Sequence, residues 1–471
     1  MQHYVSAERQ RIMTAKPSRD QLAQLDQSAL IDLILQLLDQ IEQLEARLPP
    51  PKPPTTSANS SLPPSRDQKS QRRAATAKAK HGPKVGHPGS TREWCPAPDQ
   101  VTQQRVSVCQ GCGADLAASS QVVERRHQLL ELPPISAQVI EVQQCGLDCP
   151  HCGRHNLAAP PVGCDLEQVL GARLQSVLVY LKHTHHLSYE RMEQVLLDVF
   201  GVALSQGAID NCLRRAGQAA QPAVAAIQAA VASAPVIHGD ETGSRIDGAK
   251  AWHWVFVTVT AVLHLIRRSR GQDVPRAMMG TQRAAVWVCD CWSGQLNAPA
   301  DTFQLCLAHQ VRNLQALIDA GGEAMIWAAQ VQAIFYNTMR LAHPQRRALV
   351  PSAIFAAEWT DLERQLDDLL DEAVPKGPAR TLQKRYHKHR QHLFVCLART
   401  DVPATNNVAE RALRPAVVHR NVTNGFRSQW GADGYAALLS ITDTAKLHGQ
   451  SPFLAILDLL GPPALPLVAP E

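Results

Sequence analysis

"PVIHGDET", residues 235–242, opens the most strand-like part of this 471-residue chain. Apolar residues follow a proline and lead into two acids, which predicts a short buried strand that ends at Asp240. Aromatic and β-branched residues dominate positions 252–262, and Asp247-Gly248 precedes them as a hairpin turn would. We therefore expect two further strands, at 252–260 and 261–268.

Helix and strand then alternate. "DVPRAMM" (273–279) predicts a helix, "AAVWVCD" (284–290) a fourth strand that ends at Asp290, and "FQLCLAH" (303–309) a fifth strand after another helix. Three consecutive strands followed by helix, strand, helix and strand describe a ribonuclease-H-like mixed sheet in an α/β protein. Ligands gather at the carboxyl ends of such strands. If the first and fourth strands are neighbours, Asp240 and Asp290 share one site.

Two neighbouring carboxylates repel each other unless a cation lies between them. Mg²⁺ prefers hard oxygen ligands and binds through few carboxylates plus substrate phosphate. Displacement at a phosphodiester commonly uses two such ions about 3.5–4 Å apart. Asp240 and Asp290 therefore predict a magnesium site that needs a third carboxylate from elsewhere in the chain.

The third acid is predicted to be Glu410, in "TNNVAERALR" (405–414). The spacing also fits a helix start capped by Asn407 and an ion pair between Glu410 and Arg414, a purely structural role. Cations surround this acid, and an ionised carboxylate among cations suits a metal site that faces phosphates. These cations are Arg411, Arg414, Arg420 and Arg427.

Charge is unevenly distributed, although the net charge is only +5. Residues 65–92 hold eight Lys/Arg against one Asp, and residues 384–427 hold nine against two acids. Two basic patches on an otherwise acidic protein indicate a polyanionic partner such as DNA, whereas either patch alone would indicate solvated surface. No run of about 18 apolar residues is present, and the N-terminus has no signal core, so we expect a cytoplasmic, nucleoid-associated protein.

The N-terminal part divides into a helix (1–48) and a linker (49–94). Isoleucine and leucine alternate at intervals of four and three, which favours a coiled coil that pairs two chains, although the helix could also pack on its own body. These positions are Leu30, Ile34, Leu37, Ile41, Leu44 and Leu48. The linker is rich in proline, serine and lysine, and this composition predicts a disordered, cationic segment that binds phosphates.

Residues 95–164 carry two Cys-x-x-Cys pairs, each followed by glycine, on either side of a spacer in which 138–145 predicts a strand. Four thiolates form a closed, structural Zn²⁺ site. The expected ligands are Cys109, Cys112, Cys149 and Cys152, and possible substitutes are Cys95, Cys145, His151 and Cys164. Buried or redox-active thiols are the alternative.

The remaining segments are predicted to be helical. Residues 165–233 contain a helix, a turn at Gly201, a cap at Ser205 and a second helix, which is typical of a DNA-binding helix-turn-helix and equally of plain helical packing. Residues 310–400 predict an all-helical insertion between the two parts of the catalytic core, 234–309 and 401–471.

Several of these motifs, in this order, resemble the transposases of the insertion-sequence sixty-six family, which are Asp-Asp-Glu enzymes of bacterial mobile elements. The resemblance rests on "HGDET", on Asp290 after its strand, on "CLAHQVR" and on "NNVAERALRP". It extends to the leucine-rich helix, the cysteine module and the tail that begins "FRSQWGADGY". One departure is Asp290-Cys291-Trp292, where the family usually has Asp-Gly-Tyr.

The resemblance implies a DNA transposase that uses Asp240, Asp290 and Glu410 to bind two Mg²⁺ (or Mn²⁺). It would hydrolyse a phosphodiester at the element's ends and join the freed 3′-hydroxyl to target DNA. Partners would be the terminal inverted repeats, target DNA, a second protomer and element-encoded accessory proteins. Arg411 and Arg414 are expected to contact phosphates, and His309 and Arg312 to support the acids or contact DNA. The alternatives are an inactive or repurposed transposase that acts as a sequence-specific DNA-binding protein, and a metal nuclease that cuts without joining.

Overall fold

The structure is a computed structural model that describes residues 26–32, 34–35, 39, 89, 92–161 and 169–461. A five-stranded mixed sheet lies at its centre, in the order β5-β4-β3-β6-β7. The strands are β3 (Val236–Ile246), β4 (Ala249–Val257), β5 (Val262–Arg267), β6 (Ala284–Cys289) and β7 (Ala300–Leu305). β3, β4 and β5 are antiparallel, whereas β6 and β7 continue the sheet in parallel from β3.

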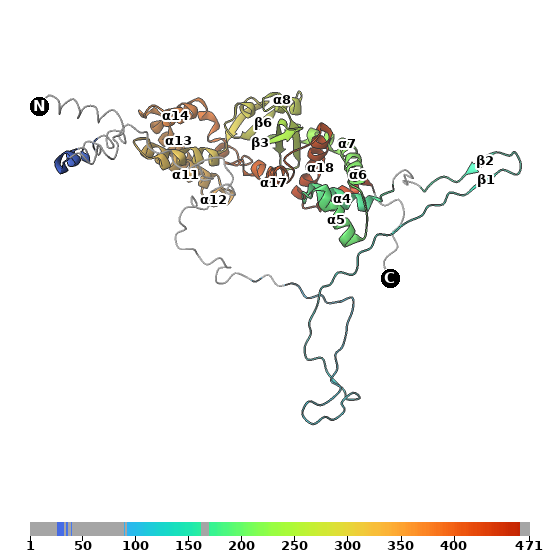
Figure 1. Cartoon of the computed structure of the whole chain (residues 1–471). Helices are drawn as coiled ribbons and strands as arrows, with labels where there is room; N and C mark the ends of the chain where they lie inside the picture. The colour runs from blue at the N-terminus through green and yellow to red at the C-terminus, as the bar shows by residue number, and fades with distance from the viewer. Residues whose placement is uncertain are drawn as a thin grey trace.

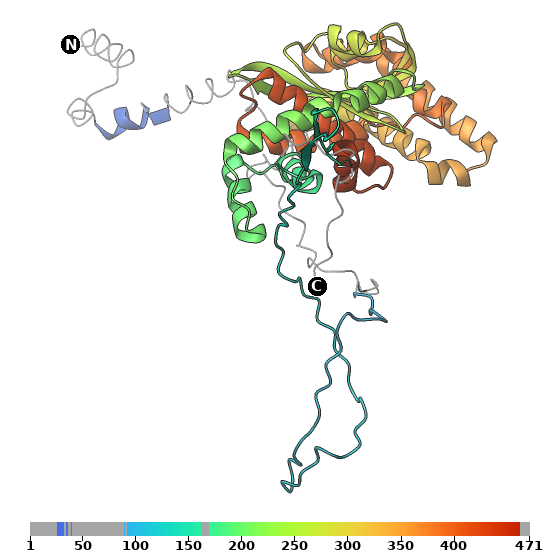
Figure 2. The ribbon, with the colours of Figure 1, turned by 90° about the vertical axis from the view of Figure 1, so that its right-hand side faces the viewer.

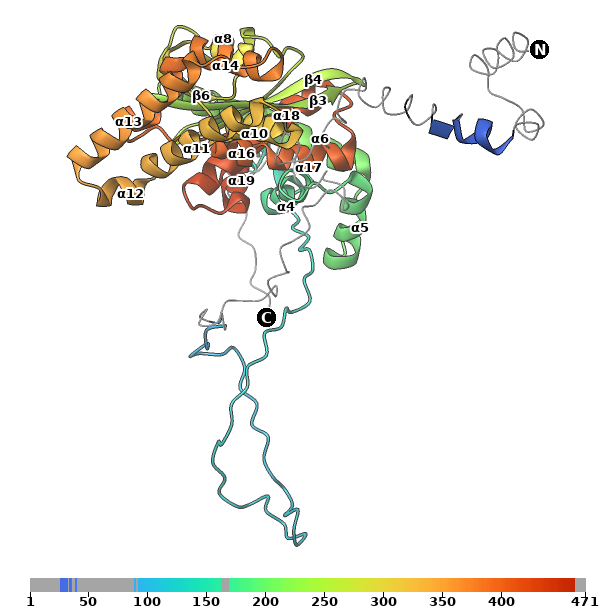
Figure 3. The ribbon, with the colours of Figure 1, turned by 90° about the vertical axis from the view of Figure 1, so that its left-hand side faces the viewer.

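The first and fourth predicted strands are therefore neighbours, as a shared acidic site requires. β3 is longer than expected, because its second half continues with β4 as a hairpin that projects from the sheet (Figure 3), and its last residue, Ile246, also bridges Phe426. Asp240 consequently lies within β3 and not at its end. The hairpin closes at Asp247 (φ 50°) and Gly248 (φ 70°), so the predicted turn is confirmed.

Helices cover both faces of the sheet (Figure 1). α7 (Gln221–Ala232), α8 (Asp273–Met279) and the short α9 (Ser293–Leu296) lie on one face, against Ile237, Trp254, Phe256 and Trp287. Residues of the opposite parity in the strands, such as Val236 and Val255, point to the other face. There α10 (Leu307–Ala320), α11 (Ala324–Ala342) and α16 (Asn407–Ala412) pack.

The edge strand β5 is protected by α18 (Gln429–Leu447). Ser440 Oγ accepts from the backbone N–H of His264 at 2.8 Å, and Thr444 Oγ1 accepts from Val262 N–H at 3.0 Å. These side chains satisfy donors that would otherwise be free to pair with another chain. α18 thereby holds the C-terminal part of the chain on the sheet.

Helices also fill residues 310–400. After α10 and α11 come α12 (Pro344–Leu349), α13 (Ser352–Asp371), α14 (Pro378–Lys388), the 3₁₀ helix η2 (Arg390–His392) and α15 (Val395–Ala398). Their core includes Trp327, Phe335, Leu366 and Tyr386, all buried. The fifth strand was predicted to reach residue 309, which is wrong, because β7 ends at Leu305 and α10 begins at Leu307.

A second helical group combines α4 (Ala172–His183), α5 (Tyr189–Phe200) and α6 (Gln206–Ala219) with α18 and α19 (Pro452–Leu460). α17 (Arg414–Thr423) joins it where His419 packs on His186 and Tyr435. The predicted turn and cap are confirmed. Gly201 (φ 65°) ends α5 in the left-handed conformation, and Ser205 accepts from the N–H of Ala208 at the start of α6. α6 and α18 cross closely, since a Cβ on Gly217 would lie 3.0 Å from the Cα of Gly434.

Residues 92–161 extend away from the sheet and helices (Figure 2). Their only paired strands in this range are β1 (Gly146–Asp148) and β2 (His155–Leu157). The strand predicted at 138–145 is wrong, because these residues pair with no strand among the described residues, and Val139 and Ile140 are exposed.

Of the predicted N-terminal helix, residues 27–32 and 34–35 are helical, and Ile34 is exposed. Leu37, Ile41, Leu44, Leu48, nearly all of the predicted linker and Cys164 lie outside the described residues. Among the described residues, no helix combines the length and the apolar character needed to cross a bilayer.

Candidate active site

Asp240 and Asp290 lie on neighbouring parallel strands. The pairing of β3 with β6 ends at His238 and Val288, so each aspartate is two residues beyond the last pair. Burial raises the pKa of Asp240 well above its usual value, and the charges of Glu241, Asp290 and Glu410 raise it further. Asp290 and Glu410 are thus near enough to Asp240 to raise its pKa, although the three acids come from distant parts of the chain.

Asn406 connects the helix that carries Glu410 to the strand that carries Asp240. Its side-chain amide donates to the carbonyl oxygen of Gly239 at 2.8 Å, and its Oδ1 lies 3.2 Å from His238 Nδ1. Its backbone N–H points to Cys306 Sγ at 3.1 Å, just before α10. Asn406 is fully buried, so these bonds fix the start of α16 against β3 and α10.

This arrangement differs from the predicted cap. The residue at the N-cap of α16 is Asn406, and it makes no side-chain cap bond because its amide is used on β3. Asn407, the predicted cap, is the first helical residue and is exposed. α16 ends at Ala412, and Arg414 begins α17, so the continuous helix assumed for a Glu410–Arg414 pair is wrong.

Glu410 is half-buried and has two neighbours on α10. Arg312 Nη2 donates to its Oε1 at 3.2 Å and to its Oε2 at 3.4 Å. His309 Nδ1 lies 3.5 Å from Oε1, too far for a strong hydrogen bond. Burial and the Arg312 charge lower the pKa of His309, so a neutral ring faces the carboxylate. His309 and Arg312 thus lie beside Glu410, in the position expected for residues that support the acids.

Cys306, His309 and Glu410 also form a group whose potential ligand atoms lie within 4.8 Å of one another. A thiolate and an imidazole suit Zn²⁺ better than Mg²⁺. Burial, however, raises the pKa of Cys306 to about 11, which keeps the thiol protonated at neutral pH. The all-oxygen set of Asp240, Asp290 and Glu410 is the better match for a hard cation.

On the opposite face of β3, Glu241 forms a buried network that the sequence did not reveal. Its Oε1 accepts from Arg270 Nε at 2.9 Å, and its Oε2 accepts from Gln295 Nε2 at 2.7 Å. Gln295 also accepts from Trp287 Nε1 at 2.9 Å. Gly239 is required here, since a Cβ would lie 2.5 Å from Gln295 Oε1. The "HGDET" motif therefore serves both faces of the sheet.

The predicted DNA-contacting arginines fall into two groups. Arg411, Arg414 and Arg427 are exposed. Arg420 instead turns toward β3, where its guanidinium donates to the Gly243 carbonyl and approaches Thr242. Arg420 therefore holds α17 against the sheet, and its contact with DNA stays a prediction.

The two Cys-x-x-Cys pairs form matching turns. The backbone N–H of Cys109 donates to the Ala114 carbonyl, and the Cys109 carbonyl accepts from the N–H of Gly113, both at 2.9 Å. Cys149 repeats this with Arg154 and Gly153. Backbone N–H groups within each turn, chiefly those of Cys112 and His151, lower the pKa of Cys109 and Cys149. Within the described residues, however, the four cysteines do not meet in one group, so the zinc site stays a prediction.

Comparison with known proteins identifies the family of this chain. The sequence model of the transposase IS66 family matches residues 167–434, which include all three acids. The chain is also 23% identical over 418 residues to the uncharacterized protein y4hP of Sinorhizobium fredii (strain NBRC 101917 / NGR234), covering 78% of this chain and 73% of that relative. Since the family match spans more than half of the chain, this protein belongs to the IS66 family of transposases.

Proposed function

We propose that this protein is an active DNA transposase in which Asp240, Asp290 and Glu410 form the catalytic centre. The observation that carries the proposal is that Asp240 and Asp290 each lie two residues beyond the last pair of the parallel strands β3 and β6, while Asn406 holds the helix of Glu410 against Gly239. Like charges are gathered here at an energetic cost, which is expected at functional sites. The strand order β5-β4-β3-β6-β7 supports a ribonuclease-H-like fold. Asp240 and Asp290 lie just beyond the paired, parallel portions of β3 and β6.

The three carboxylates fit a pair of divalent ions. They offer hard oxygen donors, and their mutual repulsion would be relieved by cations. When bound, Mg²⁺ (or Mn²⁺) supplies Lewis-acid activation of the attacking oxygen and stabilises charge on the phosphate. Arg312 donates to Glu410 and orients its carboxylate, and Asn406 holds the start of α16 against β3.

The proposed reaction has two steps. Water attacks the phosphodiester at the element's end, which breaks the bond to the 3′-oxygen and leaves a 3′-hydroxyl and a 5′-phosphate. The 3′-hydroxyl then loses its proton and attacks a phosphodiester of target DNA in line, and the target's 3′-oxygen leaves. Arg411, Arg414 and Arg427, which are exposed, would contact the phosphates.

We assign the other parts of the chain supporting roles. The turns at Cys109 and Cys149 would hold one structural Zn²⁺ with Cys112 and Cys152, and α5 and α6 would read the terminal repeats. α6 presents Asn211, Arg215 and Gln218 on its exposed side. The N-terminal helix would pair protomers, as synapsis of two DNA ends requires.

The test is strand transfer by purified protein on duplexes that carry the ends flanking its coding region. Wild type should release 3′-hydroxyl ends and join them to a plasmid target, and Asp240→Ala should abolish both while retaining DNA binding. Binding without cleavage by wild type would indicate a repurposed DNA-binding protein. Cleavage without joining would indicate a nuclease.

A further inference from the structure

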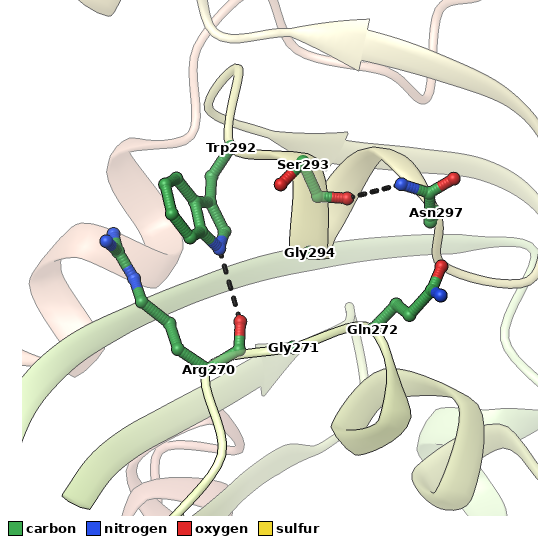
Figure 4. Close-up of a pocket in the computed structure, with 7 residues that line it drawn as sticks. All are labelled: Arg270, Gly271, Gln272, Trp292, Ser293, Gly294 and Asn297. Atoms are coloured by element: carbon green, nitrogen blue, oxygen red, sulfur yellow. Dashed lines mark hydrogen bonds between the residues drawn. The ribbon is translucent and has the colours of Figure 1, made fainter.

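A pocket of about 430 Å³ opens between Trp292 and Asn297, and its lining includes Arg270, whose side chain pairs with Glu241 (Figure 4). Its lining is Arg270, Gly271, Gln272, Trp292, Ser293, Gly294 and Asn297. The pocket is directly linked to the catalytic centre, because the backbone N–H of Trp292 donates to Asp290 Oδ1 at 2.9 Å. None of these residues has a role in the proposed two-step reaction.

One wall of the pocket is a stacked, rigid surface. The Arg270 guanidinium lies 3.8 Å from the ring centroid of Trp292 and 4.4 Å from that of Trp252. Glu241, whose side chain is only 1% exposed, holds the Arg270 guanidinium in place through an ion pair. Trp292 Nε1 donates to the Arg270 carbonyl at 3.2 Å. Trp292 nevertheless remains 37% exposed. A partly exposed aromatic ring whose neighbours are fixed in place can stack on a flat partner.

The opposite wall is polar. The side-chain amides of Gln272 and Asn297 lie across the pocket from the Trp292 ring (Figure 4), and Asn297 donates to the Ser293 carbonyl at 2.7 Å. Amides offer donors and acceptors together, which suits the edge of a nucleobase. The lining holds no carboxylate that would repel DNA.

We propose that this pocket takes one unstacked nucleobase of the DNA whose phosphate lies at Asp290. The base would stack on Trp292, with its edge toward Gln272 and Asn297, and so fix the position of the neighbouring phosphate. This inference rests on the proposed function, because it assumes that DNA crosses Asp240 and Asp290. The pocket would be an additional binding subsite that prevents the DNA strand from sliding past Asp240 and Asp290.

The test uses a DNA hairpin with a single unpaired 2-aminopurine at its 3′ end, mixed with full-length protein without divalent ions. Stacking on Trp292 should quench the 2-aminopurine emission on binding. Trp292→Ala should lose the quenching and bind the tailed hairpin about tenfold more weakly, which is within the range for one stacked base. Trp292→Phe should keep both, and Tyr336→Ala, an exposed aromatic on α11, should match wild type.

A blunt hairpin should bind equally to all four proteins. Wild type should also lose about tenfold in affinity when the 2-aminopurine is replaced by an abasic site, a comparison that requires no mutant to fold. Equal quenching by Trp292→Ala and wild type would overturn the pocket assignment, as would no effect of the abasic site. Strand cleavage is measured separately, so the pocket and the catalytic proposal can fail independently.

Discussion

Asn406 Nδ2 donates to the carbonyl oxygen of Gly239 at 2.8 Å, and this bond joins two segments 167 residues apart. Gly239 precedes Asp240, and Asn406 begins the helix of Glu410. The relative position of two of the proposed catalytic acids, Asp240 and Glu410, therefore depends on one buried amide. A displacement of about 1 Å can cost a hundredfold in rate when reacting groups must be aligned.

Asn406→Ala should therefore lower strand cleavage by about 10- to 100-fold while DNA affinity changes little. It should also destabilise the fold by about 1–3 kcal/mol, since buried partners lose their bonds. Asn407→Ala, the exposed neighbour, is the matched control and should behave as wild type. Cleavage rate, DNA affinity and thermal unfolding are measured on all three proteins. If Asn406→Ala and Asn407→Ala had equal effects, the Asn406–Gly239 bond would not be what positions the two acids.

The arginines that follow Glu410 should separate into two kinds. Arg414→Ala should weaken DNA binding and lower the slope of log affinity against log salt by about 0.9, as loss of one phosphate contact does. Arg420→Ala should instead lower thermal stability, because its guanidinium donates to the Gly243 carbonyl. Arg364→Ala on α13, an exposed arginine paired with Asp361 and Asp368, is the control for charge. If the slope of log affinity against log salt is unchanged in Arg414→Ala, Arg414 does not contact a DNA phosphate.

The sheet could be predicted from sequence because its signals are local. Val236 and Ile237 occupy opposite faces, and the Asp247-Gly248 turn sets the register of the hairpin. The Arg270–Glu241 pair could not be predicted, because it depends on side-chain directions in segments 29 residues apart. The cap was misassigned for a similar reason: Asn406 and Asn407 are equivalent in sequence, and only contact with Gly239 distinguishes them.

A buried histidine cluster should make the fold sensitive to acid. Burial lowers the pKa of His183 and His253, and it lowers the pKa of His419 to about 3. The unfolded chain takes up these protons near pH 6.5 and the folded chain does not, so stability is complete above that pH and falls below it. The expected loss is about 1 kcal/mol per histidine for each pH unit below 6.5.

Thermal unfolding between pH 7.5 and 5.5 checks this. His419→Phe, which can keep the stacking on Phe426 and Tyr435, should reduce the pH dependence, and His185→Phe at an exposed position should not. An unfolding temperature that stays constant over this range in wild type would contradict the prediction.

The cysteine turns predict how the protein responds to metal removal. Both turns place Cys109 and Cys149 in the same backbone geometry, with N–H groups that favour the thiolate, the form that binds Zn²⁺. Purified protein should therefore contain one zinc per chain, which a chelator removes. Because residues 92–161 extend away from the sheet, the unfolding temperature of the remainder should change little (Figure 2).

Cys109→Ser and Cys149→Ser should each lose the metal, since a three-thiolate site is incomplete. Cys145→Ser is the matched control: Cys145 is exposed and lies outside both turns, so its loss should leave the zinc content unchanged. Metal content is measured by mass spectrometry and DNA affinity by anisotropy, with specific binding to the element's ends expected to fall with the zinc. If Cys149→Ser keeps its zinc while Cys145→Ser loses it, the ligand set shifts to Cys145 and the matching of the two turns has no role in metal binding.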